Sequence, residues 1–171
     1  MNLRLGEDIT PQDDTNLLET PPIVASDALS SAALVDACQC RGKETILLVE
    51  DAPLVRKATA EALQSAGYTV LIAENATQAL EIYRVSSNSV DLLLTDVVMS
   101  GIGGRELAQT LFFLCPHVRI VLMSGYAEQI ALCSLSSFRT EYMAKPFSVL
   151  TLLRRVRHAL DKNPPEVGAS A

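Results

Sequence analysis

The feature that most constrains the fold is a series of five short apolar runs that alternate with five segments of helical periodicity. The runs are continuously apolar, as expected of strands that are buried on both faces of a sheet. Strands that alternate with helices in this way predict an α/β domain with a parallel sheet. The expected strands are Thr45–Val49, Thr69–Ala73, Asp91–Thr95, Val118–Met123 and Glu141–Ala144.

The helical segments are indicated by residues that start or stop helices. Pro53 suits a first helical turn, and Gly67 is placed to end the same helix. Asn75 and Gln78 form a capping pair before the next helix. The expected helices are Pro53–Ala66, Ala76–Val85, Gly104–Leu114, Ala127–Leu135 and Ser148–Leu160.

Apolar stripes on two helices predict which side faces the core. On the first helix the stripe consists of Leu54, Val55, Ala58, Ala62 and Leu63. On the last helix it consists of Val149, Leu152, Leu153, Val156 and Leu160. We expect the basic residues opposite that second stripe to form a solvated face: Arg154, Arg155, Arg157 and His158.

Composition divides the chain into one globular domain and two tails. Residues 1–43 are rich in Asp, Thr, Ser, Pro and Ala, which predicts a disordered or linker segment. Residues 44–162 contain all the expected strands and helices, and residues 163–171 are expected to be a disordered tail. With 49% apolar residues, the chain can form a real core.

Charge, hydropathy and cysteine spacing exclude several classes of function. The net charge of −6 leaves no basic excess for nonspecific nucleic-acid binding, and no segment is apolar enough to cross a membrane. The cysteine spacing fits neither a zinc site nor a C-x-x-C motif, which suits a reducing cytoplasm. Cys38 and Cys40 are interpreted as linker thiols, with a redox pair as the alternative, and Cys115 and Cys133 as reduced packing residues.

Polar side chains follow four of the expected strands: Glu50 and Asp51, Asp96, Ser124 and Lys145. Burying carboxylates together costs free energy, because desolvation and like charges both oppose their ionisation. A divalent cation offsets this cost, and ligands that offer only oxygen atoms suit Mg²⁺. Because ligands bind at the carboxyl ends of parallel strands, these residues predict a metal-assisted phosphoryl site.

Four motifs together resemble those of a known family. They read Ile-Leu-Leu-Val-Glu-Asp at 46–51, Leu-Leu-Leu-Thr-Asp-Val-Val-Met at 92–99, Val-Leu-Met-Ser-Gly-Tyr at 121–126 and Tyr-Met-Ala-Lys-Pro-Phe at 142–147. Over residues 44–162 the chain resembles the receiver (CheY-like) domain of two-component response regulators. The resemblance implies a flavodoxin/CheY-like (βα)5 fold, a three-layer doubly wound parallel sheet with strand order 2-1-3-4-5.

The same resemblance implies a role for each residue of the acidic site. Asp96 corresponds to the phosphoacceptor, whose carboxylate attacks phosphorus to give an aspartyl phosphate. Glu50 and Asp51 resemble the acidic pair that holds Mg²⁺ together with Asp96. The main-chain carbonyl of Val98 would complete the protein ligands.

Three further roles follow from the resemblance. Lys145 would place its charge against the phosphoryl group, and Ser124 would donate a hydrogen bond to it. Tyr142 resembles the aromatic switch of the family. Simpler interpretations stay open for each position: Glu50 and Asp51 as acids that complement a helix dipole, Ser124 as a turn residue and Tyr142 as a packing residue.

The chain departs from the family pattern at two positions. Ser100 stands where the family usually has proline, which should loosen the loop through the entropy of the unfolded state, by roughly 1 kcal/mol or less. The glycine before the fifth strand is also missing, because residues 138–140 read Phe-Arg-Thr. We expect the Lys145–Pro146 bond to be cis, as it often is in the family.

The resemblance implies a single-domain response regulator of a two-component phosphorelay rather than an enzyme. It would take its phosphoryl group from a histidine kinase or a histidine phosphotransfer protein. It would then signal to a downstream protein through the face of the fourth helix, the fifth strand and the fifth helix. Binding to nucleic acid or to a membrane is not expected.

Other functions remain as alternatives. The chain could be an auxiliary or detached receiver of a hybrid histidine kinase, since residues 42–46 resemble the start of such a receiver, or a receiver-like scaffold that is not phosphorylated. A phosphatase with an aspartyl nucleophile is disfavoured because Val98 stands where a second Asp is needed. A flavodoxin-like cofactor binder is disfavoured because Glu50 and Asp51 would repel phosphate without a metal.

Overall fold

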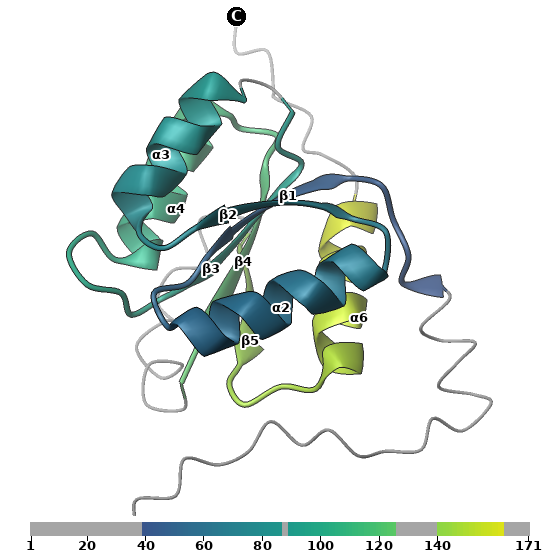
Figure 1. Ribbon diagram of the computed structural model, residues 1–171. Helices are drawn as coiled ribbons and strands as arrows, with labels where there is room; N and C mark the ends of the chain where they lie inside the picture. Colours follow the sequence, from purple (N-terminus) through teal and green to yellow (C-terminus); the bar gives the residue numbers. More distant parts are fainter. Residues whose placement is uncertain (1–38, 87–88, 126–139, 163–171) are drawn as a thin grey trace, which may run out of the picture.

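The computed structural model describes residues 39–86, 89–125 and 140–162. These residues form three layers, with a parallel sheet between two layers of helices (Figure 1). The strand order is β2-β1-β3-β4-β5, which confirms the predicted (βα)5 topology. Every neighbouring pair of strands is parallel. The strands are β1 Thr45–Val49, β2 Thr69–Ala73, β3 Leu92–Asp96, β4 Arg119–Ser124 and β5 Thr140–Ala144.

The third strand begins and ends one residue later than predicted. Asp91 lies just before the strand, where its side-chain Oδ2 accepts a hydrogen bond of 2.8 Å from Thr45 N. At the other end, Asp96 is paired in register with Met123. Asp96 is therefore the last residue of β3, still held by the sheet.

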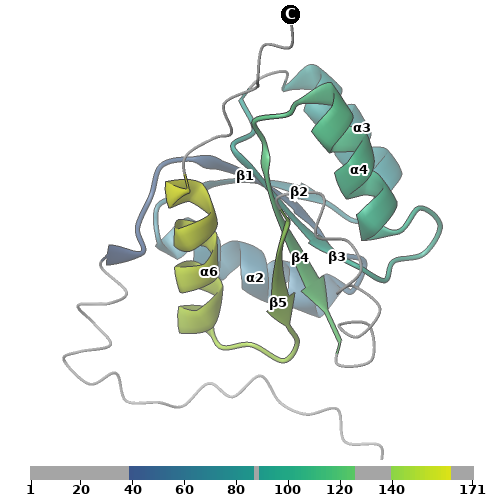
Figure 2. The same cartoon turned by 180° about the vertical axis from the view of Figure 1, so that it is seen from behind.

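Helices cover both faces of the sheet (Figures 1 and 2). Helices α3 (Ala76–Val85) and α4 (Gly104–Leu114) lie on one face, and α2 (Pro53–Ser65) and α6 (Val149–Asp161) lie on the other. The predicted helix Ala127–Leu135 lies outside the described residues. No helix in the described ranges is long and apolar enough to cross a membrane.

The predicted helix signals are confirmed at the starts and ends of the helices. Pro53 lies in the first turn of α2. Asn75 Oδ1 accepts a hydrogen bond of 2.9 Å from Gln78 N, which caps α3. After α2 the chain turns at Gly67 with φ of 98°, a left-handed conformation that favours glycine.

Two apolar clusters fill the spaces between the layers. Successive residues of β1 and β3 point to opposite faces, so each strand contributes to both clusters. One cluster, under α2 and α6, contains Ile46, Leu48, Leu92, Leu94, Leu152 and Val156. The other, under α3 and α4, contains Leu47, Val49, Leu93, Leu107 and Leu111. Burial on both faces explains why these strands are continuously apolar.

The first residue of each predicted helical stripe is not in the core. Leu54 is 81% exposed and Val149 is 53% exposed. Both lie in the first turn of their helices, at the edge where the strands end. The buried face of α2 carries Leu63, as predicted, together with Thr59 and Ala60, which were not in the predicted stripe.

Two predictions about polar and linker residues were wrong at the opposite edge of the sheet. Cys40 is buried at 4% exposure, and Tyr68 donates a hydrogen bond of 2.8 Å to its carbonyl oxygen, so it is not a linker thiol. Burial also raises the pKa of the Cys40 thiol. Arg157 does not belong to a solvated face, because its guanidinium lies 2.9 Å from Glu44. Cys38 lies outside the described residues.

Candidate functional site

The register of the sheet places the predicted acidic residues next to one another. Val49 of β1 pairs with Thr95 of β3, so the next residues along, Glu50 and Asp96, lie at the same level. Glu50 N donates a hydrogen bond of 3.2 Å to Ala73 O of β2, so the main chain of Glu50 is still tied to the sheet. Two carboxylates therefore meet at the carboxyl edge of β1 and β3.

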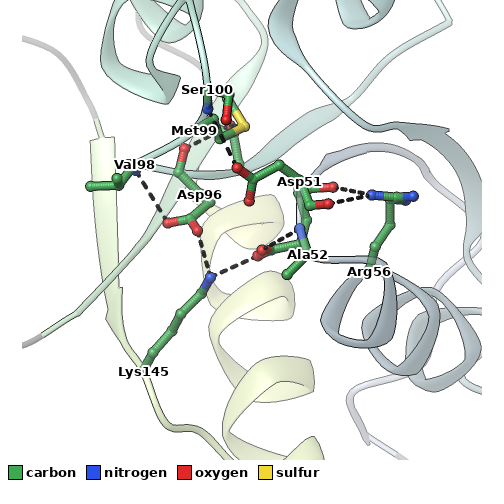
Figure 3. A network of polar contacts seen from close by, with 10 residues as sticks. Asp51, Ala52, Arg56, Asp96, Val98, Met99, Ser100 and Lys145 are labelled. Atoms are coloured by element: carbon green, nitrogen blue, oxygen red, sulfur yellow. Dashed lines mark hydrogen bonds and ion pairs between the residues drawn. The ribbon is translucent and has the colours of Figure 1, made fainter.

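The same register brings Ser124 and Lys145 to this edge. Ser124 pairs with Ala144, and the next residue, Lys145, donates a hydrogen bond of 2.8 Å from its main-chain N to Ser124 O. The Lys145–Pro146 bond is cis, as predicted. The Lys145 side chain extends back over the end of the sheet toward the acids (Figure 3).

Lys145 joins the two buried carboxylates. Its Nζ lies 2.7 Å from Glu50 Oε2 and 2.7 Å from Asp96 Oδ2. Glu50 is 1% exposed and Asp96 is 8% exposed, so both acids need a partner to offset the loss of hydration. The ammonium group provides one for each.

The local environment shifts the pKa values of two of these groups. Burial raises the pKa of Glu50, and the hydrogen bond and charge of Lys145 oppose that rise without cancelling it. Burial acts to lower the pKa of Lys145, but its hydrogen bonds to Asp96 and Glu50 outweigh burial and raise it. Lys145 therefore keeps its positive charge inside the site.

Asp51 completes a group of three acids. Carboxylate oxygens of Glu50, Asp51 and Asp96 all lie within 4.8 Å of one another. Asp51 is exposed, so the group opens to solvent on that side. Three carboxylates against one ammonium leave negative charge unmatched, and the donors are all oxygen. This donor set fits Mg²⁺, which prefers carboxylate oxygens and keeps some of its waters.

The loop after Asp96 surrounds the acids with main-chain donors. Val98 N lies 3.3 Å from Asp96 Oδ1, and Ser100 N lies 3.4 Å from Asp51 Oδ2 (Figure 3). A proline at position 100 would have no N–H to offer Asp51. The departure at Ser100 thus adds a donor to the site, a role beyond the looser loop predicted from the sequence.

Ser124 carries a buried hydroxyl at the end of β4. Its side chain is fully buried, and its Oγ makes no hydrogen bond within the described residues. Thr95, buried nearby on β3, shows the usual arrangement, because its hydroxyl donates to Asp96 O at 3.1 Å. An unsatisfied buried hydroxyl costs about 1–3 kcal/mol, so it is normally retained for a reason.

Two residues of the site were not predicted from the sequence. Arg56 Nη1 lies 2.6 Å from Glu50 O and 3.0 Å from Asp51 O. A cation near a helix N-terminus is electrostatically unfavourable, and that position was the signal that could have identified Arg56. Gly104 is the second, because a Cβ built there would lie 1.8 Å from Asp96 O. Only glycine lets α4 begin so close to the main chain of Asp96.

Tyr142 lies on β5 and packs between the sheet and α4. It is half-buried and contacts the cluster under α3 and α4. It also lines a small pocket together with Arg105, Ala108, Gln109, Ile120, Leu122 and Thr140. This position is compatible with simple packing and with a switch, so the switch role stays a prediction.

A family model and relatives of known function match the globular part of the chain. The model for the response regulator receiver domain matches residues 46–157. The sensor kinase CckA of Brucella abortus is 37% identical over 127 residues, covering 74% of this chain and 13% of the kinase. The phosphate regulon transcriptional regulatory protein PhoB of Pseudomonas aeruginosa is 33% identical over 125 residues, covering 71% of this chain and 54% of PhoB. The chain thus spans only part of the length of these relatives.

Solved structures share the same fold. The receiver domain of the hybrid histidine kinase CckA is 30% identical, with a TM-score of 0.58 over 68% of this chain and 98% of that one. A receiver domain protein from Clostridium thermocellum has a TM-score of 0.64 at 24% identity, over 68% of this chain and 94% of that one, and supports the fold alone. From the family match, the relatives and the fold, the chain belongs to the response regulator receiver family and has the role of a phosphorelay receiver.

Proposed function

We propose that Asp96 is the residue of this receiver that accepts the phosphoryl group. The observation that carries the proposal is the position of Lys145, whose Nζ lies 2.7 Å from Asp96 Oδ2 and 2.7 Å from Glu50 Oε2. A cation that already touches the carboxylate is placed to compensate charge on a group transferred to it. The receiver itself corresponds to residues 44–162.

The covalent step transfers a phosphoryl group from a donor to the side chain of Asp96. A carboxylate oxygen of Asp96 attacks phosphorus, a P–O bond forms, and the bond between phosphorus and the donor breaks. The donor atom leaves with the electron pair of that bond. For a phosphohistidine donor this atom is an imidazole nitrogen, and for acetyl phosphate it is an acetate oxygen. The product is an aspartyl phosphate.

The neighbouring residues would stabilise the product. Lys145 would lie against the phosphoryl oxygens, and the buried Ser124 hydroxyl, which has no partner among the described residues, would donate to one of them. Because the hydroxyl is already desolvated, this hydrogen bond replaces no contact with water. Ser124 therefore has a chemical reason to be polar.

Receiver domains bind Mg²⁺ at an acidic pocket, and the acids of this chain form such a cluster. Glu50, Asp51 and Asp96 would hold the ion, with the main-chain carbonyl of Val98 as a further ligand. When bound, Mg²⁺ supplies positive charge to the oxygens of the phosphoryl group. Without it, the unmatched charge of the three acids would repel an incoming phosphate.

Phosphorylation would change the surface around β5. A phosphoryl group adds about −1.5 to −2 charge and three acceptors, which would draw Ser124 toward it. Tyr142 would then change its packing, and with it the face formed by the predicted fourth helix, β5 and α6. The partner at that face would be a protein, and no direct binding to nucleic acid is proposed.

Receiver domains interact with histidine kinases or phosphotransfer proteins, and they are generally signalling modules rather than enzymes. We propose that this chain has the same kind of donor and turns over no substrate of its own. Its described thiols, Cys40 and Cys115, are free, which suits the cytoplasm. The similarity to the hybrid kinase CckA favours one second candidate, an auxiliary receiver that works beside such a kinase.

The proposal is tested by incubating the purified chain with acetyl phosphate, with and without Mg²⁺, and measuring the intact mass of the protein by mass spectrometry. Wild type should gain one phosphoryl group only with Mg²⁺, and Asp96→Asn should gain none. Asp91→Asn is the matched control, because Asp91 precedes β3 at the opposite end and bonds Thr45 N. Uptake by Asp96→Asn, or its absence in wild type, would overturn the proposal.

A further inference from the structure

In the loop that carries the acidic pair, Glu50 N is bonded to Ala73 O, but the carbonyls of Glu50 and Asp51 accept no main-chain hydrogen bond within the described residues. Strand β1 ends at Val49, and the first bond of α2 at this end is from Arg56 N to Ala52 O. Ala52, the N-cap, has no side-chain cap. The carbonyl groups of Glu50 and Asp51 fall between strand and helix, in neither ladder.

Arg56 occupies this gap. Its Nη1 donates to Glu50 O at 2.6 Å and to Asp51 O at 3.0 Å, from the first turn of α2 (Figure 3). The side chain is half-buried. One guanidinium nitrogen thus fixes two consecutive peptide groups, those of the two neighbouring acids.

The carboxylates of Glu50 and Asp51 differ in how firmly hydrogen bonds hold them. Glu50 is held by Lys145 at 2.7 Å, with Ala52 N at 3.3 Å. Asp51 is exposed, and within the described residues its carboxylate has one long bond, of 3.4 Å from Ser100 N. The direction of the Asp51 side chain therefore depends on its own main chain, which Arg56 fixes.

We propose that Arg56 is a positioning residue for Mg²⁺: by holding the carbonyls of Glu50 and Asp51 it fixes the direction of their carboxylates. The inference rests on the proposed function, in which these acids bind the ion. Mg²⁺ demands nearly octahedral geometry. If the loop is free to move, the affinity of the site for Mg²⁺ therefore falls even with both carboxylates present. Groups that orient metal ligands typically contribute 10–100-fold to metal affinity.

Charge and positioning predict opposite results for removal of Arg56. As a cation near the site, Arg56 repels Mg²⁺, so by charge alone its loss would tighten binding. As a positioning residue its loss weakens binding. Lys57, the adjacent cation on α2, separates the two effects, because it is exposed and pairs with Glu61 at 3.9 Å on the same helix.

The test is a Mg²⁺ titration of the full chain by calorimetry, on wild type, Arg56→Met, Arg56→Lys and Lys57→Met. We expect Arg56→Met to raise the Kd about tenfold or more, and Arg56→Lys, which keeps the charge and one donor group, to fall between it and wild type. Lys57→Met should bind as wild type or slightly more tightly. Far-UV circular dichroism checks the fold, and Arg56→Gln replaces Arg56→Met if the latter does not fold.

Equal or tighter Mg²⁺ binding by Arg56→Met would overturn the inference and leave the proposed function intact. A lower melting temperature with an unchanged Kd would also overturn it, because the role would then be structural only. If wild type itself bound no Mg²⁺, the proposed function would fail, and this inference with it. The wild-type titration therefore distinguishes the two failures.

Discussion

The ammonium of Lys145 lies 2.7 Å from Asp96 Oδ2 although β5 and β3 are not neighbours in the sheet. Strand β4 lies between them, so the long lysine side chain crosses the end of one strand to reach the acid. Lys145 also contacts Glu50 of the loop after β1 at 2.7 Å. One cation thereby connects three separate segments of the chain at the proposed phosphorylation site.

Replacing Lys145 with methionine should destabilise the protein in the absence of Mg²⁺. It leaves Glu50 and Asp96 buried together without a cation, a loss of about 3–5 kcal/mol in the free energy of unfolding. Added Mg²⁺ should restore part of it, because the ion supplies the missing charge. Urea denaturation with and without Mg²⁺ measures both effects. Lys57→Met, an exposed cation, should change the same free energy by less than about 0.5 kcal/mol.

If Lys145→Met were as stable as wild type without Mg²⁺, the buried acids would not depend on this lysine. If Mg²⁺ stabilised the variant no more than wild type, the ion would bind elsewhere.

Replacing Ser124 with alanine should cost little or no stability. Its hydroxyl is buried without a partner within the described residues, so its removal loses no hydrogen bond. Thr95→Val is the comparison, because that buried hydroxyl donates to Asp96 O at 3.1 Å, and its loss should lower the free energy of unfolding by about 1 kcal/mol. Both values come from urea denaturation. An equal loss for the two variants would mean that Ser124 is hydrogen-bonded in the folded protein.

Replacing Gly104 with alanine should disturb the main chain of Asp96. The new Cβ would lie 1.8 Å from Asp96 O, so backbone must move, at a cost of about 1–3 kcal/mol. Gly103→Ala is the matched control, because its nearest atom, Val97 O, is 3.4 Å away. Urea denaturation gives the stability, and uptake from acetyl phosphate reports the acceptor. Equal behaviour of the two variants would contradict the close approach.

The ion pair between Glu44 and Arg157 predicts a pH-dependent effect on stability. Burial raises the pKa of Glu44, but hydrogen bonds from the main chain and from Arg157 outweigh it and hold the pKa below its ordinary value. A lowered pKa in the folded state gives stability above the ordinary pKa that is lost as pH falls through the folded value. Glu44→Gln should therefore lose about 1 kcal/mol at neutral pH.

The difference between Glu44→Gln and wild type should shrink as pH falls from neutral through the lowered pKa of Glu44 in the folded protein, because below that pKa Glu44 is protonated in both the folded and the unfolded state. Urea denaturation at several pH values follows it. A difference that does not change with pH would show that the Glu44 charge contributes nothing.

The alternation of apolar runs and helical segments was enough to predict the sheet, because strands buried on both faces are continuously apolar. The bounds of β1 and β2 were predicted without error. Asp96 and Lys145 were also predicted to meet, because the carboxyl ends of parallel strands share one edge. These inferences need only local patterns and the geometry of parallel sheets.

Two contacts between distant segments, away from the carboxyl edge of the sheet, were not predictable from the sequence. The burial of Cys40 depends on Tyr68, and the pairing of Arg157 with Glu44 joins residues 113 apart, so neither leaves a local pattern. The role of Ser100 was misjudged because this role depends on its main-chain N–H, a group that almost every residue has. Arg56 was missed because it contacts main-chain carbonyls, and the one sequence signal was its position near a helix N-terminus, which is unfavourable for a cation.

The most direct test of the central claim is to locate the phosphoryl group chemically. After reaction with acetyl phosphate and Mg²⁺, borohydride reduces an aspartyl phosphate to homoserine and releases phosphate, which marks the acceptor permanently. Peptide mass spectrometry then identifies the marked residue. We predict homoserine at position 96 and unmodified aspartate at positions 51 and 91. Homoserine at another position, or none in a protein that has gained a phosphoryl group, would contradict the assignment of Asp96.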